Sequence, residues 1–180
     1  MGKRDTVTIP ERVGDAAEIN YAAPPAADFG PLARDRVPVR TMAERDLPAL
    51  AAIDRKITGR DRRDYFEQKF AEAVRDTDVR VSLVAEHDGV PVGFVMARVD
   101  LGEFGRMEST AVLDTIGVDP DYRGQGIGHA LLSQLLVNLS TLRVDNVRSE
   151  IDWHDRGLAG FLDVCGFAPS QQLCFERHLG

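Results

Sequence analysis

The chain has 180 residues, of which 43% are hydrophobic and 28% are charged, a composition typical of one soluble globular domain. Its 29 acidic and 22 basic side chains give a net charge of −7, which argues against nucleic acid as the main partner because phosphate binding needs a basic surface. No run of about 18 or more apolar residues occurs, so no membrane-spanning segment is expected. The two cysteines, Cys165 and Cys174, fit neither a metal site nor a disulfide framework, which favours a reducing cytoplasm and no bound metal.

Residues 1–36 differ from the rest of the chain. They are dense in alanine, proline and glycine, and no apolar period is sustained along them. Such a composition predicts a flexible or loosely packed N-terminal arm. From residue 37 onward regular apolar periods appear, so residues 37–180 are expected to form the folded domain.

The first part of this domain predicts a strand followed by two helices. Residues 37–40 are typical of a short strand, and an apolar stripe predicts a helix over about 44–56 with Pro48 in its first turn. A second helix is predicted over about 62–75, with Asp61 as its N-cap. Acids and bases interleave in this region, and we interpret them as solvated helix faces rather than a ligand site. The bases are Arg55, Lys56, Arg60, Arg62, Arg63 and Lys69.

Three strands are expected next. Alternating apolar and polar residues over 79–86 predict a half-buried strand, and Asp88-Gly89 is a hairpin-turn sequence that leads into a partner strand over 92–99. A long β run covers 107–118. The sequence therefore predicts a hairpin followed by a third strand.

The last third of the chain predicts two more helices and two more strands. A strongly apolar helix is expected over about 126–139, an alternating strand over 147–154, a short helix over 158–165 that stops at Gly166, and a final strand over 173–179. The complete order is β-α-α-β-β-β-α-β-α-β. It defines an α+β fold with a mixed sheet.

The most informative segment is residues 116–128, Ile-Gly-Val-Asp-Pro-Asp-Tyr-Arg-Gly-Gln-Gly-Ile-Gly, where a strand passes through a turn into a helix that begins in glycines. Glycines let a ligand approach the backbone closely, and the free N–H groups and dipole of a helix N-terminus bind anions. Pyrophosphate is the expected anion, and a glycine-rich turn without a ligand is the alternative. A dinucleotide fingerprint would need glycine at His129, and a Walker loop would need Gly-Lys-Ser/Thr, so neither fits.

This segment resembles the signature of the GNAT family, the Gcn5-related N-acetyltransferases. The family pattern Gln/Arg-x-x-Gly-x-Gly/Ala is matched by Arg123, Gly126 and Gly128, and the preceding Val-x-Pro by Val118 and Pro120. The order of elements over 37–179 and the terminal Gly166-Phe167 also agree. The resemblance therefore covers the whole chain except the arm.

The resemblance implies a mostly antiparallel central sheet flanked by helices, with acetyl-CoA as cosubstrate. It implies that the backbone of residues 124–128 holds the pyrophosphate, that the pantetheine pairs with the strand end at 116–118, and that the N–H of Val118 stabilises the oxyanion. Many members carry Asn at the position of Asp155, which can accept the same bonds but cannot donate an amide N–H. The expected cofactor-binding residues are Ile116, Gly117, Val118, Arg123, Gly124, Gln125, Gly126, Ile127, Gly128 and Asp155.

Two carboxylates are candidate general bases, since an amine acceptor is mostly charged at neutral pH and must lose a proton before it attacks. Glu150 matches a strand glutamate that is the base in family members acting on protein N-termini, and it is expected to share a strand face with His154. Asp114 lies on the strand that leads to the loop and is expected on the same face as Ile116 and Val118. A solvated or ion-paired carboxylate is the alternative at both positions.

One departure from the family pattern concerns the leaving thiolate. Many members have a Tyr in the last helix as general acid, and the matching residue here is Leu162, which cannot donate a proton. The resemblance places this side chain beside the thioester sulfur, whereas the apolar stripe of the helix places it in the core. The group that protonates the thiolate is therefore open.

The expected function is an acetyl-CoA-dependent N-acetyltransferase that uses direct attack by an amine in a ternary complex. A catalytically weak CoA-binding regulatory module is the rival interpretation, because of Leu162 and Asp155. No motif specifies whether the acceptor is a small-molecule or a protein amine, and the acidic Glu150, Asp152 and Asp155 favour a cationic one. A homodimer is compatible with the resemblance, and neither nucleic acid nor a membrane is an expected partner.

Overall fold

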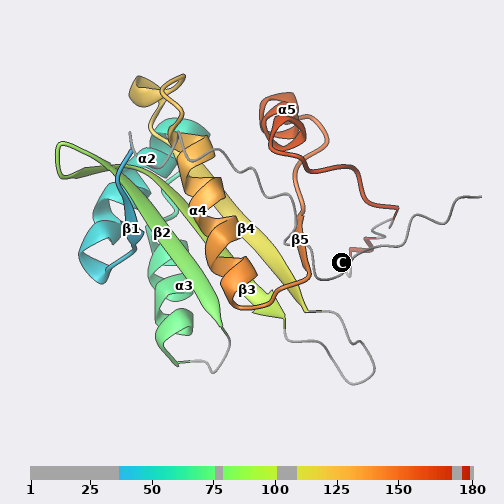
Figure 1. Ribbon diagram of the computed structural model, residues 1–180. Helices are drawn as coiled ribbons and strands as arrows, with labels where there is room; N and C mark the ends of the chain where they lie inside the picture. The colour runs from blue at the N-terminus through green and yellow to red at the C-terminus, as the bar shows by residue number, and fades with distance from the viewer. Residues whose placement is uncertain (1–36, 76–78, 101–108, 172–175, 179–180) are drawn as a thin grey trace, which may run out of the picture.

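The computed structural model describes residues 37–75, 79–100, 109–171 and 176–178. In these residues a five-stranded sheet has the order β1-β2-β3-β4-β5, and every neighbouring pair is antiparallel except the parallel pair β4 and β5 (Figure 1). The strands are β1 (Val39–Thr41), β2 (Arg80–His87), β3 (Val90–Asp100), β4 (Thr110–Val118) and β5 (Asn146–Ser149). The predicted α+β fold with a mixed, mostly antiparallel sheet is confirmed.

Helices cover both faces of the sheet. One face is covered by α4 (Ile127–Thr141), and the other by α2 (Leu47–Thr58) and α3 (Arg63–Arg75) (Figure 1). A 3-10 turn over Glu44–Asp46 precedes α2, a second one over Pro120–Tyr122 precedes α4, and α5 (Arg156–Val164) follows β5. The four predicted helices are therefore present, with ends that differ by a few residues.

The sheet is buried on both sides because β3 contributes alternate residues to two cores. Val95 packs with Leu131 of α4 in one core. Phe94 and Met96 face the opposite core beneath α2 and α3, where the rings of Phe94 and Phe66 meet edge to face with centroids 5.4 Å apart. These two layers hold α2 and α4 on opposite faces of the same strands.

The turn between β2 and β3 is the predicted hairpin. Asp88 and Gly89 have φ angles of 51° and 77°, both left-handed, which is the geometry of a type I′ turn. His87 pairs with Val90 directly across it. The Asp-Gly sequence therefore predicts the turn, whereas the shift of register between Ala85 and Glu86 farther along the pair is not visible in it.

The prediction of a strand over 147–154 is wrong beyond residue 149. The chain turns there, because Asp152 Oδ1 accepts a hydrogen bond from the His154 N–H at 2.7 Å and the Asp155 N–H donates to the Asp152 carbonyl at 2.9 Å. Trp153, within this turn, is 87% exposed. The alternation of apolar and polar residues does not reflect a sheet face here, since a short Asp side chain competes with strand pairing for backbone N–H groups.

Two predictions lie outside the described residues. The N-terminal arm, residues 1–36, is one of them. The final strand expected over 173–179 is the other in large part, and its described residues 176–178 are not in a strand. No helix in the described part of the chain is both long enough and apolar enough to cross a membrane.

Candidate active site

The candidate site forms where β4 and β5 separate. Their parallel ladder runs from Thr110 opposite Asn146 to Leu113 opposite Ser149, and the Ser149 hydroxyl donates to the Leu113 carbonyl at 3.2 Å. Beyond this pair β4 continues to Val118, while the chain after β5 leads to α5, so the two segments diverge (Figure 1). The last part of β4 therefore extends beyond its ladder with β5.

A β-bulge at Asp114 marks the same point. Met96 of β3 pairs with Thr115 and Ala97 pairs with Leu113, so Asp114 has no partner in the register. An extra residue of this kind bends the strand and increases its twist, which accounts for the divergence of β4 from β5.

The bulge shows that the prediction of one shared face for Asp114, Ile116 and Val118 is wrong. Ile116 and Val118 pack against the core beneath α4. Asp114 instead accepts a hydrogen bond from Arg98, whose two neighbours along β3 both belong to the core beneath α4. Because side chains alternate along a strand, Arg98 and its partner Asp114 lie on the opposite face of the sheet.

A cleft of about 450 Å³ lies between the end of β4, the start of α4, the start of α5 and the last turn of α2. Its lining residues are Ile57, Ile116, Gly117, Val118, Arg123, Gly128, Asp155, Gly157, Leu158 and Phe161. Six of these are among the predicted cofactor-binding residues. The other predicted ones, Gly124, Gln125, Gly126 and Ile127, form the adjoining turn and helix start without lining the cleft.

Asp119 organises the turn between β4 and α4. Its nearly buried carboxylate accepts from the Asp121 N–H at 3.0 Å, its own N–H donates to the Val92 carbonyl at 2.8 Å, and its carbonyl accepts from the Tyr122 N–H at 2.9 Å. These bonds are made entirely within the protein. The turn is therefore ordered by the chain itself.

Left-handed glycines complete the turn. Gly124 and Gly126 have φ angles of 75° and 78°, a region that other residues rarely adopt. Gly126 is the N-cap of α4, and the first bond of the helix runs from the Ala130 N–H to the Gly126 carbonyl at 3.0 Å. The N–H groups of the first turn have no acceptor four residues earlier in the helix, so this end of α4 fits an anion such as pyrophosphate.

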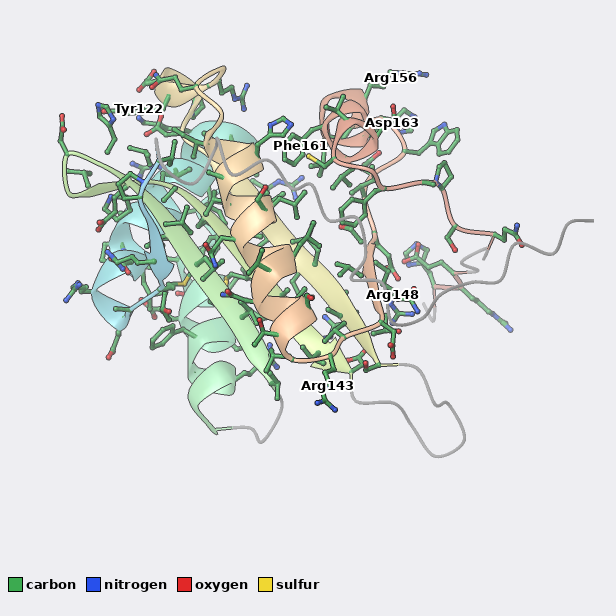
Figure 2. All side chains as sticks on the ribbon, in the orientation of Figure 1. Tyr122, Arg143, Arg148, Arg156, Phe161 and Asp163 are labelled. Carbon is green, nitrogen blue, oxygen red and sulfur yellow. The ribbon has the colours of Figure 1, made fainter. Side chains whose placement is uncertain are left out.

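Two other glycines are required by packing within the protein. A Cβ on Gly117 would lie 2.8 Å from the Phe94 ring, and a Cβ on Gly128 would lie 3.1 Å from the Phe161 ring. Phe161 also meets the ring of His129 with centroids 5.3 Å apart, between α5 and the start of α4 (Figure 2). These glycines therefore permit the close approach of protein side chains, a reason that the sequence does not reveal.

The backbone N–H of Val118 points away from β3. Val118 and Gly93 face each other in the antiparallel ladder, and the N–H of the next residue, Asp119, donates to the Val92 carbonyl, so the N–H of Val118 itself points to the other edge of β4. That edge faces the diverging β5, and Val118 lines the cleft. A donor at this place can bond a carbonyl oxygen of a molecule in the cleft.

Lys56, in the last turn of α2, joins that helix to the turn before α4. Its ammonium lies 2.8 Å from Asp119 Oδ2 and 2.9 Å from Asp121 Oδ2. Hydrogen bonds to these two carboxylates raise the pKa of Lys56. Burial opposes ionisation of Asp119, but the bond from Lys56 keeps the pKa of that carboxyl below its ordinary value. Lys56 is exposed, as expected for a solvated helix face, and it also forms ion pairs that the sequence does not predict.

The two candidate bases flank the point where the strands part, without lining the cleft. Asp114 and Glu150 directly follow Leu113 and Ser149, the last ladder pair. The Asp114 side chain is 12% exposed and accepts from Arg98. Glu150 is exposed and lies just after β5 rather than on it, so the strand face predicted for it does not exist.

Leu162 belongs to the core. It is 6% exposed, packs in the core beneath α4 and does not line the cleft. The side chains that α5 turns toward the cleft are Leu158 and Phe161. Of the two alternatives open for Leu162, the structure supports the core position.

Sequence reasoning missed the part of the cleft that α2 and α5 contribute. Ile57, Gly157, Leu158 and Phe161 line it. Leu158 and Phe161 are visible in the sequence as an apolar stripe, but such a stripe fits a core equally well. Ile57 comes from a helix about 60 residues away from the turn, and only the fold brings it there.

The protein is an α+β domain whose mixed sheet opens beside a glycine-rich helix start. A family model described as "Acetyltransferase (GNAT) family" matches residues 47–167. The chain therefore belongs to the GNAT acetyltransferase family, as its signature residues indicate. No curated protein matches the chain.

Solved structures share the fold. A transcriptional regulator from Bacillus halodurans C-125 has a TM-score of 0.68 at 18% identity, with 79% of this chain and 99% of that chain covered. AAC(6')-Iy in complex with the bisubstrate analog CoA-S-monomethyl-acetylneamine has a TM-score of 0.67 at 17% identity, with 79% and 97% covered. Aminoglycoside antibiotic 6'-N-acetyltransferase AAC(6')-Ih from Acinetobacter baumannii has a TM-score of 0.66 at 18% identity, with 80% and 99% covered. At these identities the likeness shows the fold.

Proposed function

We propose that the protein is an N-acetyltransferase that moves an acetyl group from acetyl-CoA to an amine by direct attack in a ternary complex. The observation that carries this proposal is the cleft, because the free edge of β4 at Val118 and the start of α4 line the same cavity of about 450 Å³. The thioester and the pyrophosphate belong to one cosubstrate, so one cleft must offer donors to both. Membership of the GNAT family supports the same chemistry.

In this proposal the N–H groups of residues 124–128 hold the pyrophosphate, and Arg123, which lines the cleft, adds positive charge. The pantetheine lies along the edge of β4 at 116–118. Asp155 caps α5 by accepting from the Leu158 N–H at 2.9 Å and has lone pairs left for an amide N–H of the pantetheine. Acetyl-CoA supplies the activated acyl group, and the Val118 N–H stabilises the negative charge that develops on its carbonyl oxygen.

We propose Glu150 as the general base and Asp114 as the alternative. Both follow the last ladder pair, beside the point where β4 and β5 separate. The guanidinium of Arg98 occupies lone pairs of Asp114, whereas Glu150 is exposed and open to an incoming amine. Neither Phe161 nor Leu162 carries a proton donor, so the leaving thiolate takes its proton from water.

The acceptor in this proposal is a cationic amine. Glu150, Asp152 and Asp155 are exposed carboxylates on the segment between β5 and α5, and they favour a positively charged molecule. Proteins of similar fold include aminoglycoside acetyltransferases, one of them solved in complex with sisomicin, which supports a polyamine-like small molecule over a protein amine.

The test is thiol release from acetyl-CoA with a panel of small-molecule polyamines, aminoglycosides and peptides, with the product checked by mass spectrometry. Glu150→Gln should lower turnover about 10²-fold or more, because it keeps the shape and removes the proton acceptor. CoA affinity, measured by calorimetry, should stay close to wild type in this variant. If Asp114→Asn loses turnover and Glu150→Gln does not, the base is Asp114.

The same measurements separate the enzyme from the rival, a catalytically weak CoA-binding regulatory module. A module would bind CoA in calorimetry and release no thiol with any amine of the panel. An enzyme would do both. Failure to bind CoA at all would refute both functions.

A further inference from the structure

Lys56 contacts three carboxylate oxygens of the turn that leads into the glycine segment. Its Nζ lies 3.0 Å from Asp119 Oδ1, 2.8 Å from Asp119 Oδ2 and 2.9 Å from Asp121 Oδ2. The residue is in the last turn of α2, where a cation also meets the negative end of the helix dipole. Lys56 is not part of the family signature, and only the fold brings it to this turn.

Asp119 and Asp121 lie in an unfavourable place for an anion site. They precede Arg123 and the glycines that receive the pyrophosphate in the proposed function by only a few residues. Unpaired carboxylates at this range repel an anion, because charges act over a Debye length of about 8 Å at physiological ionic strength. Asp119 is also needed where it is, since its side chain and backbone order the turn. The ammonium of Lys56 neutralises one of these two negative charges.

The same lysine connects the turn to one wall of the cleft. Ile57, the next residue of α2, lines the cleft. Its Cδ1 would lie 3.2 Å from a Cβ on Gly117, at the end of β4. The ion pairs of Lys56 therefore fix the last turn of α2 against the entry to the glycine segment, next to the residue that forms the wall.

We propose that Lys56 is a positioning residue for the cosubstrate. It offsets one of the two negative charges of Asp119 and Asp121 beside the pyrophosphate turn, and it holds the wall formed by α2 in place. This inference rests on the proposed function, because it requires an anionic cosubstrate at the start of α4.

The test is a double-mutant cycle on CoA binding, measured by calorimetry. Lys56→Met keeps the bulk of the side chain and removes its charge, and the Kd for CoA should rise about tenfold. Asp121, whose side chain is 73% exposed, can lose its charge in Asp121→Asn without disturbing the core. Adding Asp121→Asn to Lys56→Met should recover about threefold of the lost affinity, and Lys56→Arg should stay within about twofold of wild type.

A kinetic readout and a matched control complete the design. In Lys56→Met the KM for acetyl-CoA should rise with the Kd, while kcat at saturating acetyl-CoA changes little, because the lysine does not contact the reacting atoms. Lys69→Met removes a lysine from the pair of Lys69 and Glu72 on α3, 3.1 Å apart and remote from the cleft. Its CoA affinity should equal that of wild type.

The outcomes separate this inference from the proposed function. A wild-type protein that does not bind CoA refutes the proposed function itself. A wild-type protein that binds CoA, with equal affinity in Lys56→Met, overturns this inference alone. A loss that Asp121→Asn does not restore even in part overturns the electrostatic role of Lys56, since it would then act only as a structural tether. If Lys56→Met does not fold, the CoA affinity of the single variant Asp121→Asn is the test. This variant should bind CoA more tightly than wild type, and unchanged or weaker binding overturns the inference.

Discussion

Gly126→Val tests the assignment of the pyrophosphate turn. Gly126 has a φ of 78°, a backbone conformation that L side chains rarely adopt, whereas a Cβ there would meet no atom within 4 Å. A substitution at this position is therefore strained by its backbone and not by a steric clash. Holding a non-glycine residue in this region costs roughly 1–2 kcal/mol, and a β-branched one is a genuine outlier. The free energy of unfolding, measured with urea, should fall by about this amount. The new side chain also stands at the N-cap of α4, so the Kd for CoA should rise about tenfold or more, near 1.4 kcal/mol.

Two further variants separate strain from obstruction at this glycine. Gly166, just after α5, has a φ of 87° and also no atom within 4 Å of a Cβ. Gly166→Val should therefore lose similar stability and keep wild-type affinity for CoA. Gly126→Asn should regain stability, because Asn tolerates the left-handed region, yet still weaken CoA binding. Wild-type CoA affinity in a folded Gly126→Val protein would refute the assignment of this turn.

Two more predictions concern buried residues. The Asp46 carboxylate, 3% exposed, accepts from Arg40 at 2.7 Å, and this bond lowers the pKa of Asp46 below 3.8. Because the pKa of Asp46 is lower in the folded state, its ionised carboxylate stabilises the fold above about pH 4, and this stabilisation is lost as the pH falls further. Asp46→Asn should therefore lower the free energy of unfolding by about 1–3 kcal/mol at pH 7 and by less at pH 3, as measured by urea titration. An equal loss at both pH values would contradict this. Leu162→Tyr should overpack the core, which costs about 1–3 kcal/mol of stability, so the melting temperature should fall while turnover stays unchanged. Increased turnover would show that the side chain does reach the thiolate.

The fold was predictable where local patterns decide the structure. The alternation over 79–86 and the Asp88-Gly89 turn predict the β2–β3 hairpin, because turn geometry and side-chain period agree there, but they do not predict the register shift between Ala85 and Glu86. The strand predicted over 147–154 failed because Asp152 offers its own carboxylate to the backbone at residue 154. An alternating sequence does not show whether the backbone N–H groups donate their hydrogen bonds to a neighbouring strand or to a side chain.

The site was predictable where a single segment provides it. The glycines of 116–128 follow one another in the chain, so their combined role is visible in the sequence. The bulge at Asp114 is not, because it depends on the register with β3, and one extra residue reverses the face of every side chain before it. The ion pairs of Lys56 with Asp119 and Asp121 join positions 63 and 65 residues apart, and a charged helix residue in a mixed-charge stretch gives no sign of such a partner.

The position of Leu162 shows how far a residue-by-residue resemblance extends. Counting back from Gly166 identifies Leu162 as the match of the family Tyr, but the count does not fix the rotation of α5. Leu158 and Phe161, three residues apart, lie on one face of a helix and line the cleft, whereas Leu162 is buried in the core. The ring of Phe161 is held in place by Gly128 and His129, so the start of α4 and the orientation of α5 are set by the same contact. Among the described residues that line the cleft none carries a hydroxyl, and this follows from Phe161 as much as from Leu162, because a hydroxyl introduced at position 162 alone would lie in the core.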